Sequence, residues 1–192
     1  MERIAIIGWG SLLWDLDDLE PHVSGDWFVE QGPTLPIEFA LVSRKRNRAL
    51  AAVIDHAVGE HCAASVIESS KQSLPEALSD LARRERCDEQ HIGAVRRDKG
   101  FTQAKLPQTL VLVEEWLHTT HYDCAVWTDI ETNFEVMTGD AFTVSTAVGY
   151  LKALGEESLR EAKQYIENAP AAVSTPLRRR LQDEDWWAVL EF

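Results

Sequence analysis

Short segments with the composition of β-strands precede the first long amphipathic helix of this 192-residue chain. Strands are predicted at residues 3–7, 37–43, 50–54 and 61–68, which are rich in apolar and β-branched side chains. Such close spacing favours antiparallel pairing, because a parallel connection needs a long crossover. The order of strands, helix, strands and helices excludes strict βαβ alternation. We therefore expect an α+β fold, built on a mostly antiparallel sheet or barrel, in a single domain over residues 1–192.

The remaining elements follow from local signals. A helix is predicted at residues 73–86, where Ser73 and Glu76 have the spacing of a capping box. The polar segment 44–48 predicts a hairpin turn, with Asn47 at positive φ. Further predictions are strands at 110–117 and 123–130 and helices at 146–154 and 157–168. The Trp-rich tail has no clear assignment, and it could dock on its own domain or form a dimer contact.

Composition excludes several classes of protein. The chain has 19 Lys and Arg against 32 Asp and Glu, a net charge of −13, which argues against nucleic acid and anionic membranes as partners. Cys62, Cys87 and Cys124 lack the spacing of a disulfide framework or a zinc ribbon and fit reduced thiols. There is no secretory signal and no apolar run of about 20 residues. We expect a soluble cytoplasmic protein.

Glu85 has an unusual place in the predicted helix. At about 100° per residue it lies about 20° from Leu74, inside the apolar stripe that also contains Leu78 and Leu81. The other charged residues of this helix fall outside the stripe: Glu76, Asp80, Arg83, Arg84 and Arg86. A buried carboxyl is suited to general acid–base chemistry, because desolvation moves its pKa towards neutrality. The alternative is that Glu85 lies in a frayed last turn and faces water.

The first predicted strand runs into Gly8-Trp9-Gly10-Ser11. Such a turn exposes backbone N–H groups that can bind an anion, and glycine allows close approach of a ligand. A dinucleotide fingerprint is not formed, because Leu13 occupies the place of its third glycine. The structural alternative is a strand-ending turn with packed tryptophans.

These features together resemble the γ-glutamylcyclotransferase-like family. The resemblance is carried by the opening IAIIGWGSLLW and by a helix that ends in Leu81-x-x-x-Glu85, with LAAVID, GEHCAASVIESS and CAVWTDI in the expected order. It implies a small mixed, mostly antiparallel β-barrel with surrounding helices. It also implies release of 5-oxoproline from a γ-glutamyl amine, dipeptide or glutathione, with no metal or cofactor.

The resemblance assigns roles to individual residues. Glu85 would carry the proton, and Gly10, Ser11 and Leu12 would supply backbone contacts to the γ-glutamyl group. The substrate site would also include Trp9 and Trp127, which stand where the family has tyrosines, and tryptophan lacks the hydroxyl acceptor. A non-catalytic small-molecule-binding module of the same fold is therefore a second hypothesis, and a homodimer is left open.

Two weaker signals complete the sequence. A metal-dependent hydrolase would need His118 and His121 to converge with Asp123 and Cys124, whereas a polar hairpin tip explains the same residues. A nucleophilic pair would need Cys87 to meet His91. Packing is the simpler role for this thiol.

Overall fold

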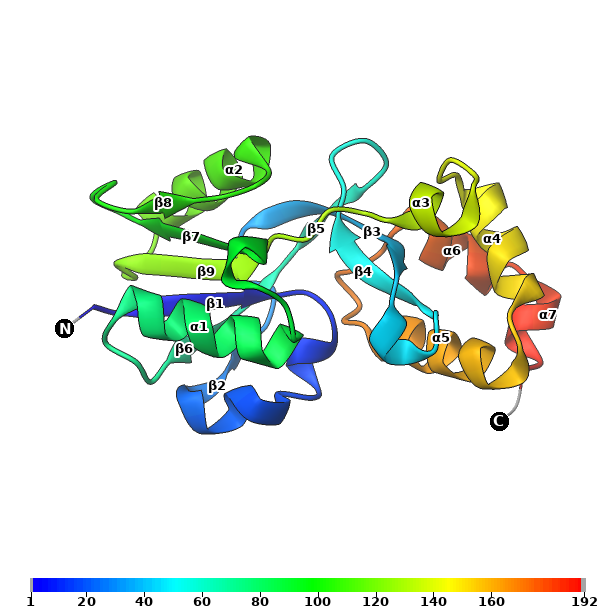
Figure 1. Cartoon of the computed structure of the whole chain (residues 1–192), viewed down its shortest axis with the longest axis horizontal. Coiled ribbons are helices and arrows are strands. Elements are labelled where there is room, and N and C mark those ends of the chain that lie inside the picture. The colour runs from blue at the N-terminus through cyan, green and yellow to red at the C-terminus, as the bar shows by residue number, and fades with distance from the viewer. Residues whose placement is uncertain (1, 191–192) are drawn as a thin grey trace. The chain divides into compact units, whose positions relative to one another are not determined.

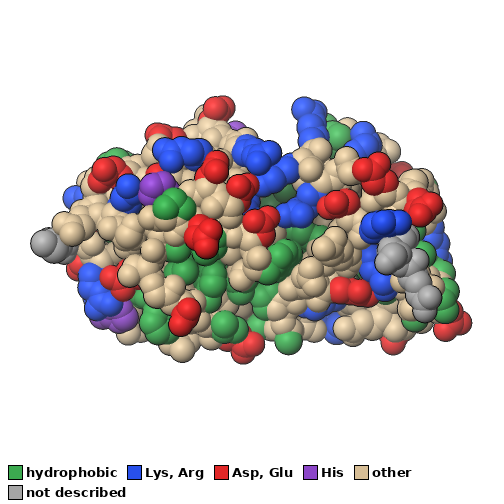
Figure 2. Space-filling model, turned by 90° about the horizontal axis from the view of Figure 1, so that it is seen from below, with side chains coloured by type: hydrophobic (Ala, Val, Ile, Leu, Met, Phe, Trp, Pro, Cys, Tyr) green, Lys and Arg blue, Asp and Glu red, His purple; other side chains and the backbone are tan. Residues whose placement is uncertain are grey.

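The computed structural model describes residues 2–190, which divide into two compact units (Figure 1). Unit 1 comprises Met1–Leu35 and Ala63–Ile130, and unit 2 comprises Pro36–Cys62 and Glu131–Phe192. Among the described residues, no helix is both long enough and apolar enough to cross a membrane. Figure 2 shows acidic and basic side chains interspersed on one face of the molecule, with hydrophobic side chains between them.

Unit 1 contains a six-stranded sheet with the order β2-β6-β1-β9-β7-β8. Its strands are β1 Ile4–Gly8, β2 Val23–Phe28, β6 Ser65–Ser69, β7 Ile92–Arg96, β8 Thr102–Gln103 and β9 Cys124–Thr128. Only β1 and β9 pair in parallel, and the other neighbours are antiparallel. The unit also contains helices α1 Leu74–Glu85 and α2 Pro107–His118, and the short 3₁₀ helices η1 Ser11–Leu13, η2 Asp17–His22 and η4 Glu89–His91.

The register of the central strands decides which side chains face α1. Ile6 lies beside Val126, and both belong to a core cluster with Leu74, Leu78 and Leu81 of α1. Side chains alternate between the faces of a sheet, so the next residue of β9, Trp127, points to the opposite face. The cluster buries the apolar stripe of α1, which is the main stabilising contact of an amphipathic helix.

Unit 2 combines a three-stranded sheet with a group of helices. The sheet has the order β4-β3-β5, formed by β3 Thr34–Val42, β4 Leu50–Ile54 and β5 Glu60–Ala63. Between β3 and β4 lies η3 Arg44–Arg46, and Asn47 has a φ of 46°, as the turn prediction required. The helices are α3 Phe134–Thr138, α4 Val144–Ala153, α5 Glu156–Asn168, α6 Pro176–Gln182 and α7 Asp185–Ala188.

The expected α+β class with mostly antiparallel sheets is confirmed. The described residues form open sheets, and no closed barrel is found among them. Within one residue or a few, the structure confirms the predicted elements at 3–7, 37–43, 50–54, 73–86, 123–130, 146–154 and 157–168. Ser73 is the N-cap of α1, but its side chain makes no cap hydrogen bond, so the predicted capping box is not formed.

One strand prediction is wrong, and a second is correct only in part. Residues 110–117 belong to helix α2, whose buried Thr109, Val113 and Leu117 recur every four residues. A short apolar run does not by itself distinguish a strand from a helix. The predicted strand 61–68 is two strands in different sheets, β5 and β6. The break falls at Ala64, which exchanges hydrogen bonds with Gly32 and Pro33 instead of continuing the ladder.

Candidate functional site

Glu85 is the last residue of α1, and its side chain is 21% exposed. The helix ends there because Arg86 adopts a left-handed conformation with φ of 54°, and its N–H donates back to the carbonyls of Ala82 and Arg83. The Cys87 N–H also donates to the Ala82 carbonyl. These bonds satisfy carbonyls of the last turn, which are otherwise left without partners at a helix end. The Glu85 backbone is thus held by a closed helix terminus.

The buried face of α1 is wider than the predicted apolar stripe. Arg84 was expected outside the stripe, yet it is only 1% exposed, and Asp80 is 6% exposed. Residues that precede α1 pack against this flank: Asp15 and Ser11 contact the Arg84 guanidinium, and His22 of η2 lies 3.7 Å from Asp80. Burial of a charge requires ionic or hydrogen-bonding partners, and the preceding loop supplies them. Glu85 is intermediate in exposure, between the predicted burial and the frayed alternative.

Arg84 connects the opening loop to Glu85. Its Nε and Nη2 atoms donate to the Asp15 carbonyl oxygen at 3.2 and 2.6 Å. Nη2 also lies 3.4 Å from Ser11 Oγ, and Nη1 lies 3.4 Å from Glu85 Oε1. One guanidinium therefore contacts both predicted parts of the site, the loop and the carboxylate.

The opening loop packs against the core of unit 1. Trp9 is 6% exposed, and Leu12 lies in the α1 core cluster at 5%. The loop closes with hydrogen bonds from Leu13 N to Gly10 O and from Trp14 N to Ser11 O. Ser11 and Leu12 open η1, and the first N–H groups of a helix have no acceptor within that helix. Arg84 Nη2 contacts the side chain of the first of these residues, Ser11.

Trp127 lies apart from this group. It is fully buried in β9, on the sheet face opposite the α1 cluster, and its indole packs against Gly93 of β7. Its Nε1 is a buried donor with no partner among the described residues. The structure therefore links Ser11 to Glu85 through Arg84, whereas Trp127 lies on the sheet face opposite the α1 cluster.

The neighbouring thiol is not an activated nucleophile. Burial, together with the negative charges of Glu85 and Asp88, raises the pKa of Cys87 to about 11. A reactive cysteine needs a lowered pKa instead. His91 Nδ1 lies 2.9 Å from Lys105 Nζ, so the partner of this histidine is Lys105 and not Cys87. Cys87 fits the packing role.

The suggested metal ligands are not assembled into a site. His118 ends α2, His121 packs against the Tyr122 ring, and Asp123 Oδ2 accepts a hydrogen bond from Arg3 N. Cys124 is fully buried, and burial raises its pKa to about 11. In the part of the chain that the structure describes, no three His, Cys, Asp or Glu side chains are grouped to hold a metal.

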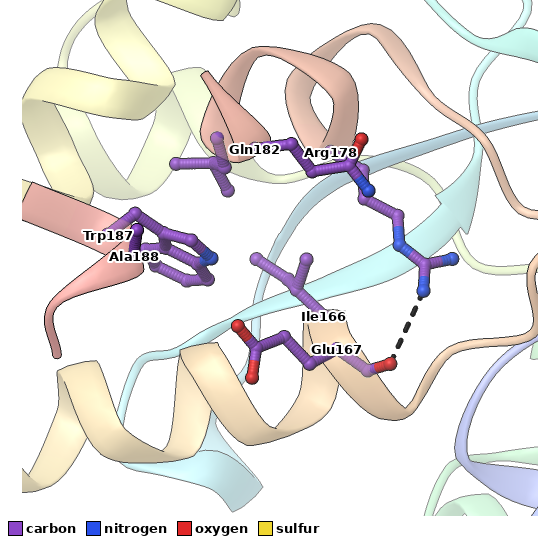
Figure 3. Close-up of a pocket in the computed structure, with 7 residues that line it drawn as sticks. Ile166, Glu167, Arg178, Gln182, Trp187 and Ala188 are labelled. Carbon is purple, nitrogen blue, oxygen red and sulfur yellow. Dashed lines mark hydrogen bonds between the residues drawn. The ribbon is translucent and has the colours of Figure 1, made fainter. Parts of the chain in front are cut away.

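A cavity of about 330 Å³ lies among α5, α6 and α7 of unit 2 (Figure 3). Its lining is Ile166, Glu167, Arg178, Leu181, Gln182, Trp187 and Ala188. The Arg178 guanidinium is already engaged, since it donates to the carbonyls of Glu167, Ala169, Pro170 and Val173. Trp187 is 4% exposed, so this part of the tail docks within its own unit. Arg178 has a structural role here, as it binds carbonyls in the last turn of α5 and just after it.

Sequence reasoning missed Arg84 as a member of the site. The signal was present in the spacing of Ala77, Asp80 and Arg84, which lie three and four residues apart and share one flank of the helix. Asp80 and Arg84 carry opposite charges one turn apart, and the small Ala77 lies beside them. This combination is compatible with a helix face that a polar loop covers. The apolar stripe alone does not indicate that a polar loop covers this flank of the helix.

Comparisons of the chain with protein-family models, with curated proteins and with solved structures find no match.

Proposed function

We propose that this chain is a γ-glutamylcyclotransferase-like enzyme that releases 5-oxoproline from a γ-glutamyl amide. The observation that carries the proposal is the contact of one buried guanidinium with both Ser11 of the opening loop and the Glu85 carboxylate. It adds to the sequence resemblance, which named the loop and this glutamate. The corresponding fold, a γ-glutamylcyclotransferase-like domain over residues 1–192, remains part of the proposal.

The reaction needs no nucleophile from the protein. The α-amine of the substrate attacks its own γ-carbonyl carbon, the γ-amide C–N bond breaks, and a five-membered lactam forms with the free amine or amino acid. Holding the substrate in a folded conformation supplies proximity. Glu85 takes a proton from the attacking amine and returns it to the leaving nitrogen, which one carboxyl can do in sequence. Its partly buried position limits the access of water.

The opening loop binds the substrate in this proposal. The N–H groups of Ser11 and Leu12, at the start of η1, donate to the γ-carbonyl oxygen as negative charge develops on it. Substrates are γ-glutamyl dipeptides, γ-glutamyl amines or glutathione, and no cofactor takes part. Trp9 provides an apolar wall beside the loop, consistent with its burial.

The test is an assay of 5-oxoproline release from γ-glutamyl dipeptides and glutathione. Glu85→Gln keeps the shape of the side chain but removes its proton transfer, so we expect activity to fall by about 10²–10⁴-fold. Glu76→Gln is the matched control, because Glu76 is an exposed glutamate on the same helix. Urea unfolding of both variants checks that the fold is retained. Wild-type activity in Glu85→Gln would exclude the mechanism.

A non-catalytic binding module is the second candidate, favoured by the position of Trp127. A residue buried on the far face of the sheet does not replace a tyrosine hydroxyl that contacts substrate. In this case γ-glutamyl compounds would raise the melting temperature of the protein, and none would yield 5-oxoproline. Product formation by the wild type would exclude this candidate.

A further inference from the structure

We propose that Arg84 is a positioning residue that holds the Glu85 carboxylate and the opening loop in a fixed relative geometry. This inference rests on the proposed function and names a residue that the resemblance did not include. Arg84 would not contact the substrate. It would act through Glu85 by limiting where the carboxylate lies while the proton moves.

The burial of Arg84 makes its contacts obligatory. A guanidinium has five N–H donors and no acceptor, and at 1% exposure it cannot rely on water. Nε and Nη2 share the Asp15 carbonyl oxygen, Nη2 also contacts Ser11 Oγ, and Nη1 contacts Glu85 Oε1. Each of the three guanidinium nitrogens therefore has a hydrogen-bond partner, and the partner of Nη1 is Glu85.

The charge of Arg84 needs a nearby anion as well. Two carboxylates are within reach: Glu85 Oε1 at 3.4 Å and Asp15 Oδ2 at 3.9 Å. Asp15 is 50% exposed and is screened by water, whereas Glu85 is 21% exposed. Glu85 is thus both the closer and the less hydrated partner of the buried cation.

Arginine suits this role in a way that lysine does not. Its planar fork donates in fixed directions to the loop and to the carboxylate at once, and a lysine ammonium is a single point on a flexible stem. Its neighbours on the helix are different. Arg83 is 56% exposed and pairs with Asp80 at 3.3 Å, and Arg86 is 64% exposed and pairs with Asp17 at 3.4 Å. Arg83 is therefore a suitable control.

The experiment measures kcat and KM for 5-oxoproline release by Arg84→Lys, with Arg83→Lys as the matched control. We expect Arg84→Lys to lower kcat about tenfold with KM within about twofold, because a displaced proton carrier slows chemistry more than binding. Arg83→Lys should keep both constants. Rates are expressed per folded molecule, with the folded fraction taken from urea unfolding.

A double-mutant cycle separates positioning from general stability. If Arg84 acts through Glu85, Arg84→Lys causes no further loss in the Glu85→Gln background. A tenfold loss that persists in that background, or a wild-type kcat in Arg84→Lys alone, would overturn the inference. Failure of the proposed function is a distinct result, since the wild type would then release no 5-oxoproline, and the inference would fall with it.

Discussion

The indole of Trp127 lies so close to Gly93 that a Cβ on Gly93 would be 2.0 Å from Trp127 Cε2. The two residues are paired across the neighbouring strands β7 and β9 in the sheet of unit 1. The fully buried ring thus occupies space that any other residue at position 93 would need. Close packing of this kind leaves little room for relaxation.

Gly93→Ala should destabilise the protein by about 1–3 kcal/mol, because the added methyl overpacks a rigid site. Urea unfolding measures the change. The cost should shrink in a Trp127→Phe background, since the smaller ring leaves space and the two sites are in contact. An unchanged cost in that background would show that the indole is not the obstacle.

Gly149→Ala is the control for Gly93→Ala, and it should change the free energy of unfolding in the opposite direction. Gly149 is an exposed position within α4, and a Cβ there would meet no atom within 4 Å. Alanine in an exposed helix interior is favoured over glycine by about 0.5–1 kcal/mol. We expect this variant to be more stable than the wild type.

Leu81→Ala tests the packing of α1. Leu81 is fully buried in the cluster that joins the helix to the sheet, so its truncation should cost about 2–5 kcal/mol in urea unfolding. Val136→Ala is the matched control, because Val136 is 87% exposed and its truncation should stay within about 0.5 kcal/mol. A loss below about 0.5 kcal/mol for Leu81→Ala would contradict the orientation of α1.

Much of the fold was predictable where hydrophobic pattern and turn chemistry agree. Residues 3–7 are followed by a glycine, residues 37–54 form two strands around a polar turn, and α1 has a clear apolar stripe. Such segments specify their structure locally. The segment 110–117 was not predictable in this way, because its short apolar run LVLV is compatible with a buried strand as well as with a helix. Asp129, distant in sequence, accepts hydrogen bonds from Lys105 N and Leu106 N just before α2.

The candidate site was predictable only in part. The helix period placed Glu85 near the buried face, and the glycines marked the loop, because both signals are local. The burial of Arg84 depends on carbonyl and hydroxyl groups from residues 11–15, about 70 positions away in sequence. The spacing of Asp80 and Arg84 within the helix marks a shared flank, but it does not identify the residues that cover that flank. The face of β9 that Trp127 occupies likewise follows from its register with β1.

Glu38 gives a prediction for the pH dependence of stability. Its carboxyl group is fully buried and accepts hydrogen bonds from Phe39 N and Leu177 N, and desolvation by burial raises its pKa above the ordinary 4.5. The folded state therefore holds this proton more tightly than the unfolded state. The protonated Glu38 carboxyl therefore contributes to stability below pH 4.5. This contribution is lost as the pH rises through the raised pKa of the folded state.

Glu38→Gln removes this titration, so the free energy of unfolding of the wild type should decline relative to the variant as the pH rises above 4.5. Glu184→Gln is the control, because the pKa of Glu184 is shifted in the opposite direction to that of Glu38. Hydrogen bonds from Arg180 and Lys152 lower the pKa of Glu184, so its stabilising effect is lost only as the pH falls below 4.5. Urea unfolding from pH 3 to pH 8 separates the two windows. A wild-type-minus-Glu38→Gln difference that stays constant above pH 4.5, or grows there, would show that the buried carboxyl does not titrate as its surroundings require.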